Sequence, residues 1–277
     1  MRLDVVLHVS LVLLLGFAFV ESELVGFETR SLRSGDELKP SSRPIRLIVM
    51  RFCPWCERVL LTLARKNVSV EIVNVNLIDK PSFLLEMHPE GKVPVLEHHH
   101  QTIIDSALIA EYLDWVYPES SVLPNDPYER ARQRMIASLI EAKMPTAVHA
   151  IINEQRSPSQ KVLTLKMMRD ALKGAEKLLD TDTFYGGKEP SFADYMTYPF
   201  VERIWIWTHE PGVTGLRLDN FPGNSYPKLQ RWFIQMQSRP EVQIATQPLS
   251  RHRLFNQGYI TGNPDFDAGV SFRRIHW

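Results

Sequence analysis

The stretch RFCPWCER, residues 51–58, holds both cysteines of the 277-residue chain. An apolar, β-branched run at 45–50 precedes it. After it, apolar residues at 59–61 and 63–64 fall on one helical face. The pattern predicts a strand, a tight turn and a helix over about 54–66, with the two cysteines where the turn meets the helix.

The position of the cysteines at this helix start predicts their chemistry. Pro54 suits the first helical position because its φ is fixed and its missing N–H would have no partner there. Cys53 is then the N-cap, where free amides and the helix macrodipole stabilise a thiolate. We expect the pKa of Cys53 to fall from about 8.5 to about 3.5–7.5, which makes it the predicted nucleophile. Cys56 lies one turn further on and is the candidate resolving thiol.

A C-x-x-C beside a βαβ pattern is typical of thioredoxin-like redox proteins, with a zinc site as the competing interpretation. A closed zinc site takes four ligands, and the chain has no further cysteine. The histidines at 98–100 occupy a predicted hairpin turn, where solvated loop residues are expected. We therefore predict no metal.

The first half of the chain alternates in a regular way. Predicted elements follow the order βαβ and then ββα. This order indicates a thioredoxin-like α/β domain over 45–118. The predicted elements are strand 45–50, helix 54–66, strand 68–76, strands 93–96 and 101–104, and helix 106–117.

Two further features lie beside the predicted reaction centre. X-Pro bonds tolerate the cis form, and we expect a cis Val93–Pro94 bond that turns the backbone of Val93 outward to pair with an extended peptide. Asp105 and Ser106 begin the next helix, where a hydroxyl and free amides can hold a carboxylate. Taken singly, Pro94 is explained as a strand starter and Ser106 as an ordinary N-cap.

The second half of the chain is predicted to be all-helical. Apolar residues at helical spacing predict helices over 128–150 and 162–179. Ser191 and Asp194 resemble a capping box that opens a third helix, which we assign to folding and not to catalysis. A last helix is expected at 232–236. We predict an all-α domain over 127–257, followed by a tail at 258–277.

The N-terminus predicts a secreted protein. Residues 5–20 are almost wholly apolar but shorter than the roughly twenty residues of a membrane span, so 1–22 is interpreted as a signal peptide, with an uncleaved anchor as the alternative. Residues 23–44 lack periodicity and are predicted to be a flexible leader. The sequon at Asn67 is a possible glycosylation site or a coincidental turn.

The charge of the chain shows no sign of a nucleic-acid-binding surface, because 32 basic residues balance 32 acidic ones.

Six short stretches together resemble the glutathione transferases, and specifically the omega class, which has a glutaredoxin-like active site. The resemblance covers about 35–255. It implies a thioredoxin-like N-terminal domain followed by an all-α C-terminal domain, and a homodimer. The stretches are MRFCPW at 50–55, DKP at 79–81, GKVPVLE at 91–97, DS at 105–106, EYL at 111–113 and LPNDPYE at 123–129.

The resemblance implies that Cys53 forms a mixed disulfide with glutathione, which is the co-substrate. It also implies how six residues hold the tripeptide. Trp55 would form one side of the pocket around the thiol, and Lys80 would pair with the glycine carboxylate. Val93 before Pro94 would hydrogen-bond the cysteinyl backbone. Asp105 with Ser106 would hold the γ-glutamyl end. Omega enzymes usually have another residue at Cys56, so this chain also resembles a dithiol glutaredoxin.

The acceptor site is implied more loosely. Arg203 would face a second substrate, or would instead be the partner of a carboxylate such as Glu202 or Asp194. Phe255 and Tyr259 belong to a C-terminal segment that closes over the cleft in this class.

The expected activity is glutathione-dependent thiol transfer to disulfides, with dehydroascorbate as a further acceptor. One alternative is a dithiol exchanger that uses Cys53 and Cys56 without glutathione. The other is a non-enzymatic protein like the intracellular chloride channels. That alternative needs an insertable segment, and 45–64 is interrupted by four charged residues, each of which costs about 2.5–3.5 kcal/mol at a bilayer centre.

Overall fold

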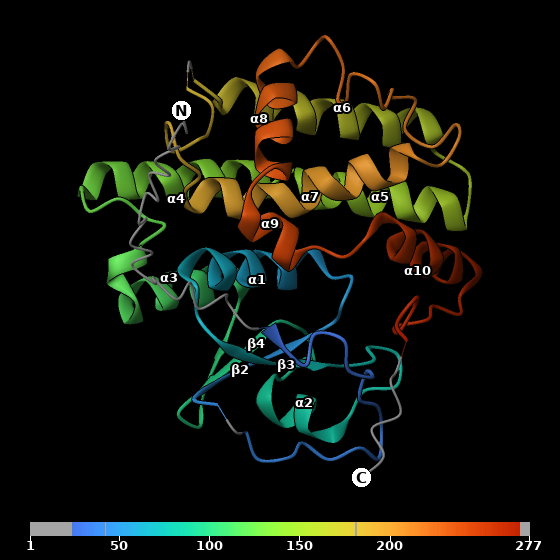
Figure 1. Cartoon of the computed structure of the whole chain (residues 1–277). Helices are drawn as coiled ribbons and strands as arrows, with labels where there is room; N and C mark the ends of the chain where they lie inside the picture. The colour runs from blue at the N-terminus through green and yellow to red at the C-terminus, as the bar shows by residue number, and fades with distance from the viewer. Residues whose placement is uncertain (1–23, 42, 181, 272–277) are drawn as a thin grey trace, which may run out of the picture.

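The computed structural model describes residues 24–41, 43–180 and 182–271. The predicted signal peptide at 1–22 and the last six residues lie outside these ranges. The described chain forms a mixed sheet with its helices and a layer of long helices stacked on one side of it (Figure 1). A helix of the first half, α1 (Pro54–Lys66), lies between the sheet and the helical layer and packs against both.

The sheet has five strands in the order β1-β3-β2-β4-β5. The strands β1, β3 and β2 are parallel, β4 runs antiparallel to them, and β5 at the other edge is antiparallel to β4. All five residues of β2 are buried, because helices cover both faces of a central strand of this kind. The strands are β1 (Leu24–Val25), β2 (Ile45–Val49), β3 (Val70–Asn74), β4 (Val95–His98) and β5 (Gln101–Ile104).

The βαβ and ββα order predicted for the first half is confirmed. The predicted helix 54–66 is α1, and the predicted helix at 106 is α3 (Ser106–Val116). A short helix, α2 (Ser82–Met87), was not predicted and covers the face of the sheet opposite α1 (Figure 1). With six residues it spans fewer than two turns, so it carries no readable helical period.

The second half is helical, as predicted, and one predicted helix is in fact two. Residues 128–150 fall on α4 (Pro127–Glu141) and α5 (Met144–Arg156), which are separated at 142–143. The helical spacing of the apolar residues therefore predicted the right type of element but missed the break before Met144, where α5 begins with Pro145 in its first turn. The others are α6 (Lys161–Leu178), α7 (Phe192–Thr208), α8 (Pro227–Gln237), α9 (Pro240–Ala245) and α10 (Leu249–Thr261).

The capping box that opens α7 is present. The Asp194 carboxylate accepts from the backbone N–H of Ser191, 2.8 Å away, and also from the Trp232 indole N–H, 2.7 Å away. Asp194 is fully buried. Besides capping α7 it therefore ties α7 to α8, which supports the assignment of this motif to folding.

The prediction of a flexible leader at 23–44 is wrong for the residues described. Leu24 and Val25 add a strand to the edge of the sheet beside β3. The next residue, Gly26, has a positive φ of 91°, and a Cβ there would lie 2.4 Å from a backbone oxygen of β3. Only glycine allows this close approach. A two-residue strand has no readable period, so the sequence carried no signal for this edge.

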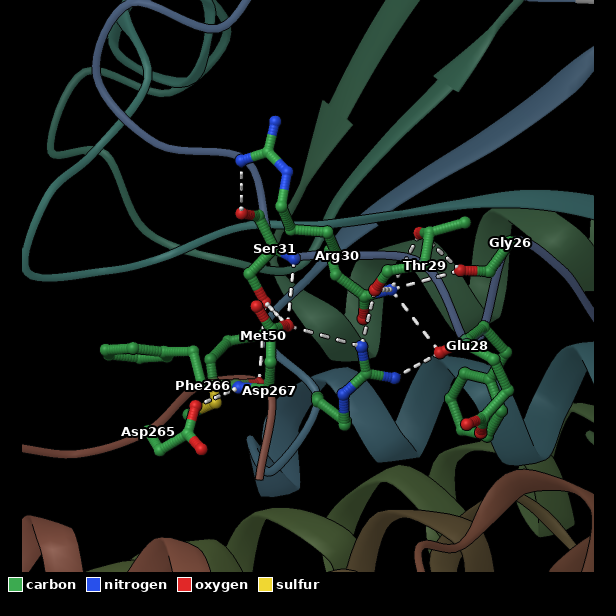
Figure 2. A network of polar contacts seen from close by, with 12 residues as sticks. Gly26, Glu28, Thr29, Arg30, Ser31, Met50, Asp265, Phe266 and Asp267 are labelled. Atoms are coloured by element: carbon green, nitrogen blue, oxygen red, sulfur yellow. Dashed lines mark hydrogen bonds and ion pairs between the residues drawn. The ribbon is translucent and has the colours of Figure 1, made fainter. Parts of the chain in front are cut away.

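The predicted start of the tail at 258 is also wrong, because α10 continues to Thr261. Beyond it, the Asp267 carboxylate accepts from the backbone N–H and the hydroxyl of Ser31, at 2.9 and 2.8 Å. Figure 2 shows these residues side by side, with the two ends of the described chain in contact. Arg51 joins them: its guanidinium donates to the carbonyls of Phe27 and Thr29 and lies 3.6 Å from Asp267.

Candidate active site

A cavity of about 940 Å³ opens between the two domains. Its walls come from the turn before α1, the loop before β4, the start of α3, and the helices α5, α7 and α10. All but one of the predicted catalytic and substrate-binding residues line it. These are Cys53, Trp55, Lys80, Val93, Pro94, Asp105, Ser106, Arg203, Phe255 and Tyr259. The exception is Cys56.

Cys53 is the N-cap of α1, with Pro54 in the first turn, as predicted. The pKa of its thiol is lowered. The largest cause is a hydrogen bond from the Cys56 thiol, and the backbone N–H groups of Cys56 and Trp55 and the charge of Arg203 add to it against the opposing effect of burial. The direction of the prediction is confirmed, and the neighbouring thiol contributes more than the helix terminus alone.

Cys56 lies behind Cys53. It is 1% exposed, against 7% for Cys53, and does not line the cavity. Burial and the hydrogen bond to Cys53 raise the pKa of Cys56 well above its ordinary value. The two thiols are both free. One is therefore set up as a thiolate that faces the cavity, and the other as a protonated hydrogen-bond donor behind it.

The side of the cavity formed by the first domain carries polar groups around Cys53. The Val93–Pro94 peptide bond is cis, as predicted. Asp105 caps α3 by accepting from the N–H groups of Ala107 and Leu108, at 2.9 and 3.0 Å. Its φ of 75° is unusual for a residue with a side chain. Ser106 is buried at the start of the same helix. The helix terminus at Asp105 and Ser106 therefore faces the cavity.

Lys80 approaches from the loop between β3 and α2. Its ammonium donates to the carbonyl of Glu90, 3.3 Å away. A cation at this rim can pair with an anionic group of a ligand in the cavity. The short loop from Glu90 to Val93 also lines the cavity and carries Gly91, whose φ of 58° favours glycine.

Arg203 lines the cavity but its guanidinium is occupied. It lies 2.6 Å from the Glu57 carboxylate and also pairs with Glu202. The two interpretations of this residue left open by the sequence were an acceptor ligand and a carboxylate partner. In the structure Arg203 pairs with Glu202, as in the second interpretation, and also with Glu57. Within the described chain it makes no bond to Asp194.

The side of the cavity formed by the helical domain is largely aromatic. The Trp55 ring lies edge-on to Phe200, with 5.1 Å between ring centroids. Phe255 stacks on Phe52 at 4.4 Å, and Tyr259 lies next to Phe255. This is the wall that a non-polar part of a ligand would contact.

Several lining residues were not predicted. His149 and Phe200 contact Trp55, Trp207 comes from the end of α7, and His252 is a buried residue of α10. A signal existed for α10, since positions 252, 255, 256 and 259 recur at the spacing of one helical face. The others come from helices whose inward face cannot be told from core residues by sequence alone.

Two predictions concern places away from the cavity. Asn67 is exposed at the C-cap of α1 with a φ of 54°, and its glycosylation stays a prediction. Among residues 24–41, 43–180 and 182–271, no three His, Cys, Asp or Glu side chains group to hold a metal ion.

Comparison with protein families gives two matches. Residues 47–121 match the glutathione S-transferase N-terminal domain, and residues 150–234 match the glutathione S-transferase C-terminal domain. Among curated proteins, glutathione transferase omega-1 of Caenorhabditis elegans is 38% identical over 250 residues, covering 89% of this chain and 99% of the relative. Human glutathione S-transferase omega-2 is 34% identical over 252 residues, covering 88% and 99%.

Solved structures share the fold. A rice glutathione transferase in complex with glutathione superposes with a TM-score of 0.68 at 20% identity, covering 80% of this chain and 99% of that one. Glutathione transferase Omega 1C of Trametes versicolor gives 0.65 at 19% identity, covering 82% and 96%. At these identities the likeness extends to the fold: a thioredoxin-like domain followed by an all-α domain.

Proposed function

The chain belongs to the omega class of glutathione transferases and is therefore a glutathione transferase, and we propose that it acts as a glutathione-dependent thioltransferase in which Cys53 forms a mixed disulfide with glutathione. The observation that carries this proposal is the position of Cys53, a thiol of lowered pKa that caps a helix at the floor of the cavity between the domains. A thiolate is the form that attacks a disulfide.

The proposed reaction has two exchanges. In the first, the Cys53 thiolate attacks the glutathionyl sulfur of a mixed disulfide, the S–S bond breaks, and the acceptor thiolate leaves and takes a proton from water. In the second, a glutathione thiolate attacks the new Cys53–glutathione disulfide, which releases oxidised glutathione and restores Cys53. Dehydroascorbate is a further acceptor that the two electrons of two glutathione molecules would reduce to ascorbate.

The groups around Cys53 support a glutathione site on the first-domain side. In this proposal Lys80 pairs with the glycine carboxylate, Val93 before the cis Pro94 bonds the cysteinyl backbone, and Asp105 and Ser106 hold the γ-glutamyl end. Each pairing matches the chemistry of the group: an ammonium with a carboxylate, backbone with backbone, and a helix N-terminus with an anion. Trp55 closes the space around the sulfur.

Conjugation of glutathione to electrophiles should be weak in this protein. A cysteine that itself bonds the glutathione sulfur does not activate that sulfur as a free nucleophile. We therefore expect thiol transfer to be the main activity of this site.

The experiment is the intact mass of the wild type and of Cys56→Ser after incubation with oxidised glutathione, with hydroxyethyl disulfide turnover measured alongside. We expect Cys56→Ser to gain one glutathione on Cys53 and to keep turning over. If this variant traps the adduct without turnover while the wild type forms a Cys53–Cys56 disulfide, the protein is a dithiol exchanger and Cys56 is its resolving thiol. Cys53→Ser should neither gain glutathione nor turn over.

A dithiol exchanger that works without glutathione remains the main rival. Lys80→Ala separates the two, because a glutathione site would pair this ammonium with the glycine carboxylate and a glutathione-independent exchanger would not. We expect it to raise the KM for glutathione by about tenfold or more, the effect of losing one charge-assisted hydrogen bond. The exposed Lys166→Ala on α6 is the control. Turnover that does not depend on the glutathione concentration would favour the rival.

A chloride-channel-like protein is the second rival. Within the described residues, one helical stretch, Pro127–Arg156, is long and apolar enough to cross a membrane by length and composition. It consists of α4 and α5, which bury Ile136, Ile140, Val148 and Ile151 in the helical domain, and a core helix of a folded domain passes the same test. The cavity and the thiol of lowered pKa that faces it favour an enzyme over a chloride-channel-like protein.

We also propose that the protein is secreted by means of residues 1–22. Expression of the full chain in cultured cells tests this, with N-terminal sequencing of protein from the medium. A new N-terminus near residue 23 is expected, and a chain retained in the membrane fraction with residue 1 present would indicate an anchor. A mass shift on treatment with a glycosidase would show whether Asn67 is modified.

Finally, we propose a homodimer. Its support is an exposed apolar stripe that α3 and α4 share, described with its test in the Discussion. A second copy of this chain is the proposed partner, besides glutathione and the acceptor.

A further inference from the structure

Arg203 reaches from α7 of the helical domain to both sides of Cys53 in the chain. Its Nη2 donates to the carbonyl oxygen of Phe52, 3.2 Å away, and lies 2.6 Å from Oε2 of Glu57. Phe52 immediately precedes Cys53. Glu57 lies on the first turn of α1, and its N–H donates to the carbonyl of Cys53 over 3.1 Å. One guanidinium therefore holds the residue before the thiol and the helical turn after it.

The cluster around Arg203 is buried, and its charges are matched within it. The side chains of Arg203, Glu57 and Glu202 are 8%, 5% and 6% exposed. Two carboxylates face one guanidinium there, so one of them is better protonated. Burial first, and then the charge of Glu57, raises the pKa of Glu202 well above its ordinary value. Burial also raises the pKa of Glu57, and both carboxylates pair with Arg203.

This arrangement leaves Arg203 poorly suited to an anionic acceptor. An acceptor anion would compete with a buried carboxylate already at 2.6 Å. Such a buried pair is costly to break, because it leaves a buried charge without its partner. The charge of Arg203 is nevertheless felt at the thiol, because it contributes to the lowered pKa of Cys53.

The other groups that act on Cys53 belong to α1. The Cys56 thiol and the backbone N–H groups of Trp55 and Cys56 belong to α1 itself. Arg58, on the next turn of α1, is buried and paired with Glu141 of α4, and interacts with the charge of Cys53. Arg203 is the cation that arrives from α7, so it is the one through which that helix acts on the thiol.

We propose that Arg203 is a positioning residue for Cys53, through which α7 fixes the turn of Phe52 and Cys53 and supports the thiolate, and that it does not bind the acceptor. This inference rests on the proposed function, in which Cys53 is the nucleophile. It assigns the cluster of Arg203, Glu57 and Glu202 to the preparation of the thiol before any substrate arrives.

The test uses the full chain with three variants. Arg203→Met removes the charge at similar size, and Arg203→Lys keeps the charge but loses the planar guanidinium that reaches both partners. Arg217→Lys is the control, since it changes an exposed arginine that pairs with Asp219. The pH profile of alkylation of Cys53 by iodoacetamide is measured with the site identified by peptide mass. The KM for hydroxyethyl disulfide is measured in parallel, and a thermal melt confirms folding.

We expect Arg203→Met to raise the midpoint of the alkylation profile by about one pH unit, as for the loss of a nearby opposite charge. Well below the midpoint, alkylation should then be about tenfold slower than in the wild type. Arg203→Lys should give a smaller rise, and Arg217→Lys none. The KM for the acceptor should stay at the wild-type value in every variant.

An unchanged midpoint in Arg203→Met together with a several-fold higher acceptor KM would overturn the inference and make Arg203 an acceptor ligand. If Arg203→Met does not fold, Arg203→Lys decides alone: a midpoint equal to that of the wild type contradicts the proposal. Failure of the proposed function looks different, because then the wild-type Cys53 itself would titrate at an ordinary pKa and take up no glutathione.

Discussion

At the scale of single residues, the two thiols of the C-x-x-C have opposite roles although they are three residues apart. Cys53 faces the cavity and has a lowered pKa, whereas Cys56 is enclosed and has a raised one. The same hydrogen bond contributes to both shifts, since it stabilises a thiolate at Cys53 and a thiol at Cys56. Cys56 can therefore assist Cys53 as a donor even in a turnover in which it never forms a disulfide.

This assistance predicts the behaviour of Cys56→Ala. Alanine removes the donor that makes the largest contribution to the lowered pKa of Cys53. Because a lost bond to the charged form disfavours that form, the pKa of Cys53 should rise, by about one unit. The pH profile of Cys53 alkylation should shift upward, so that reaction below the midpoint becomes about tenfold slower than in the wild type.

Cys56→Ser is the matched control, because a hydroxyl keeps a donor at the same place. Its profile should lie closer to that of the wild type than the profile of Cys56→Ala. Equal profiles for the wild type and Cys56→Ala would show that the helix terminus and Arg203 suffice to activate Cys53 without the second thiol.

At the scale of elements, Asp194 shows how one buried carboxylate fixes the start of α7 and its neighbours. It accepts from Tyr185 N–H at 3.0 Å, from Ser191 N–H at 2.8 Å and from the indole of Trp232 at 2.7 Å. Asp194→Ala would leave these donors buried without a partner. We expect it to lower the free energy of unfolding by about 3–5 kcal/mol, measured by urea denaturation.

The control for Asp194→Ala is Asp170→Ala on α6, an exposed carboxylate that pairs with Lys166. Its denaturation midpoint should equal that of the wild type. A loss of activity in Asp194→Ala at full stability would contradict the assignment of this motif to folding.

The contact between the two ends of the described chain leads to a second prediction at this scale. Asp267 accepts two hydrogen bonds from Ser31 and lies near Arg51, which also holds the carbonyls of Phe27 and Thr29 (Figure 2). Asp267→Ala should weaken this contact by about 1–3 kcal/mol. Faster amide hydrogen exchange at Ser31 is the expected result, because its N–H loses its acceptor.

Asp265→Ala is the control, since its side chain bonds only the backbone of Asp267 in the described chain. If exchange at Ser31 is as slow in Asp267→Ala as in the wild type, the edge strand β1 alone holds this segment in place.

The sequence predicted elements well where the signal is local and long. The helix start at Cys53 and Pro54 and the capping box at Ser191 were read directly, because cap and turn residues act on their immediate neighbours. Leu24 and Val25 were missed, since their partners are 46 residues further on in β3. Arg203 was left between two interpretations for the same reason, because Glu57 lies on another domain and only packing brings them together.

At the scale of the whole molecule, the cavity exists only because two domains meet. Cys53 and Lys80 come from the first domain, and Arg203 and Phe255 come from the second. One buried cluster of hydrophobic residues runs through both, from the strands of the sheet to α8. The thiol and the acceptor wall are therefore parts of one folding unit, and the first domain alone would lack half of its active site.

The outer surface of the same molecule carries an apolar stripe that α3 and α4 share. Leu108 and Trp115 of α3 are 46% and 60% exposed, and Met135 and Leu139 of α4 are 53% and 51% exposed. An ion pair of Glu111 with Arg134, 2.8 Å apart, brings the two helices together there. A patch of this kind that includes an exposed tryptophan is typical of an interface between proteins.

A second copy of the chain is the proposed occupant, because a twofold axis lets the same stripe cover itself. Light scattering after size exclusion should give twice the mass of one chain at micromolar concentration. Trp115→Glu places a charge in the stripe and should give the mass of one chain, because an unpaired buried charge is strongly unfavourable. Val162→Glu, at an 86% exposed position on α6, should stay dimeric. A wild type with the mass of one chain would contradict the homodimer, and a dimeric Trp115→Glu would place its interface elsewhere.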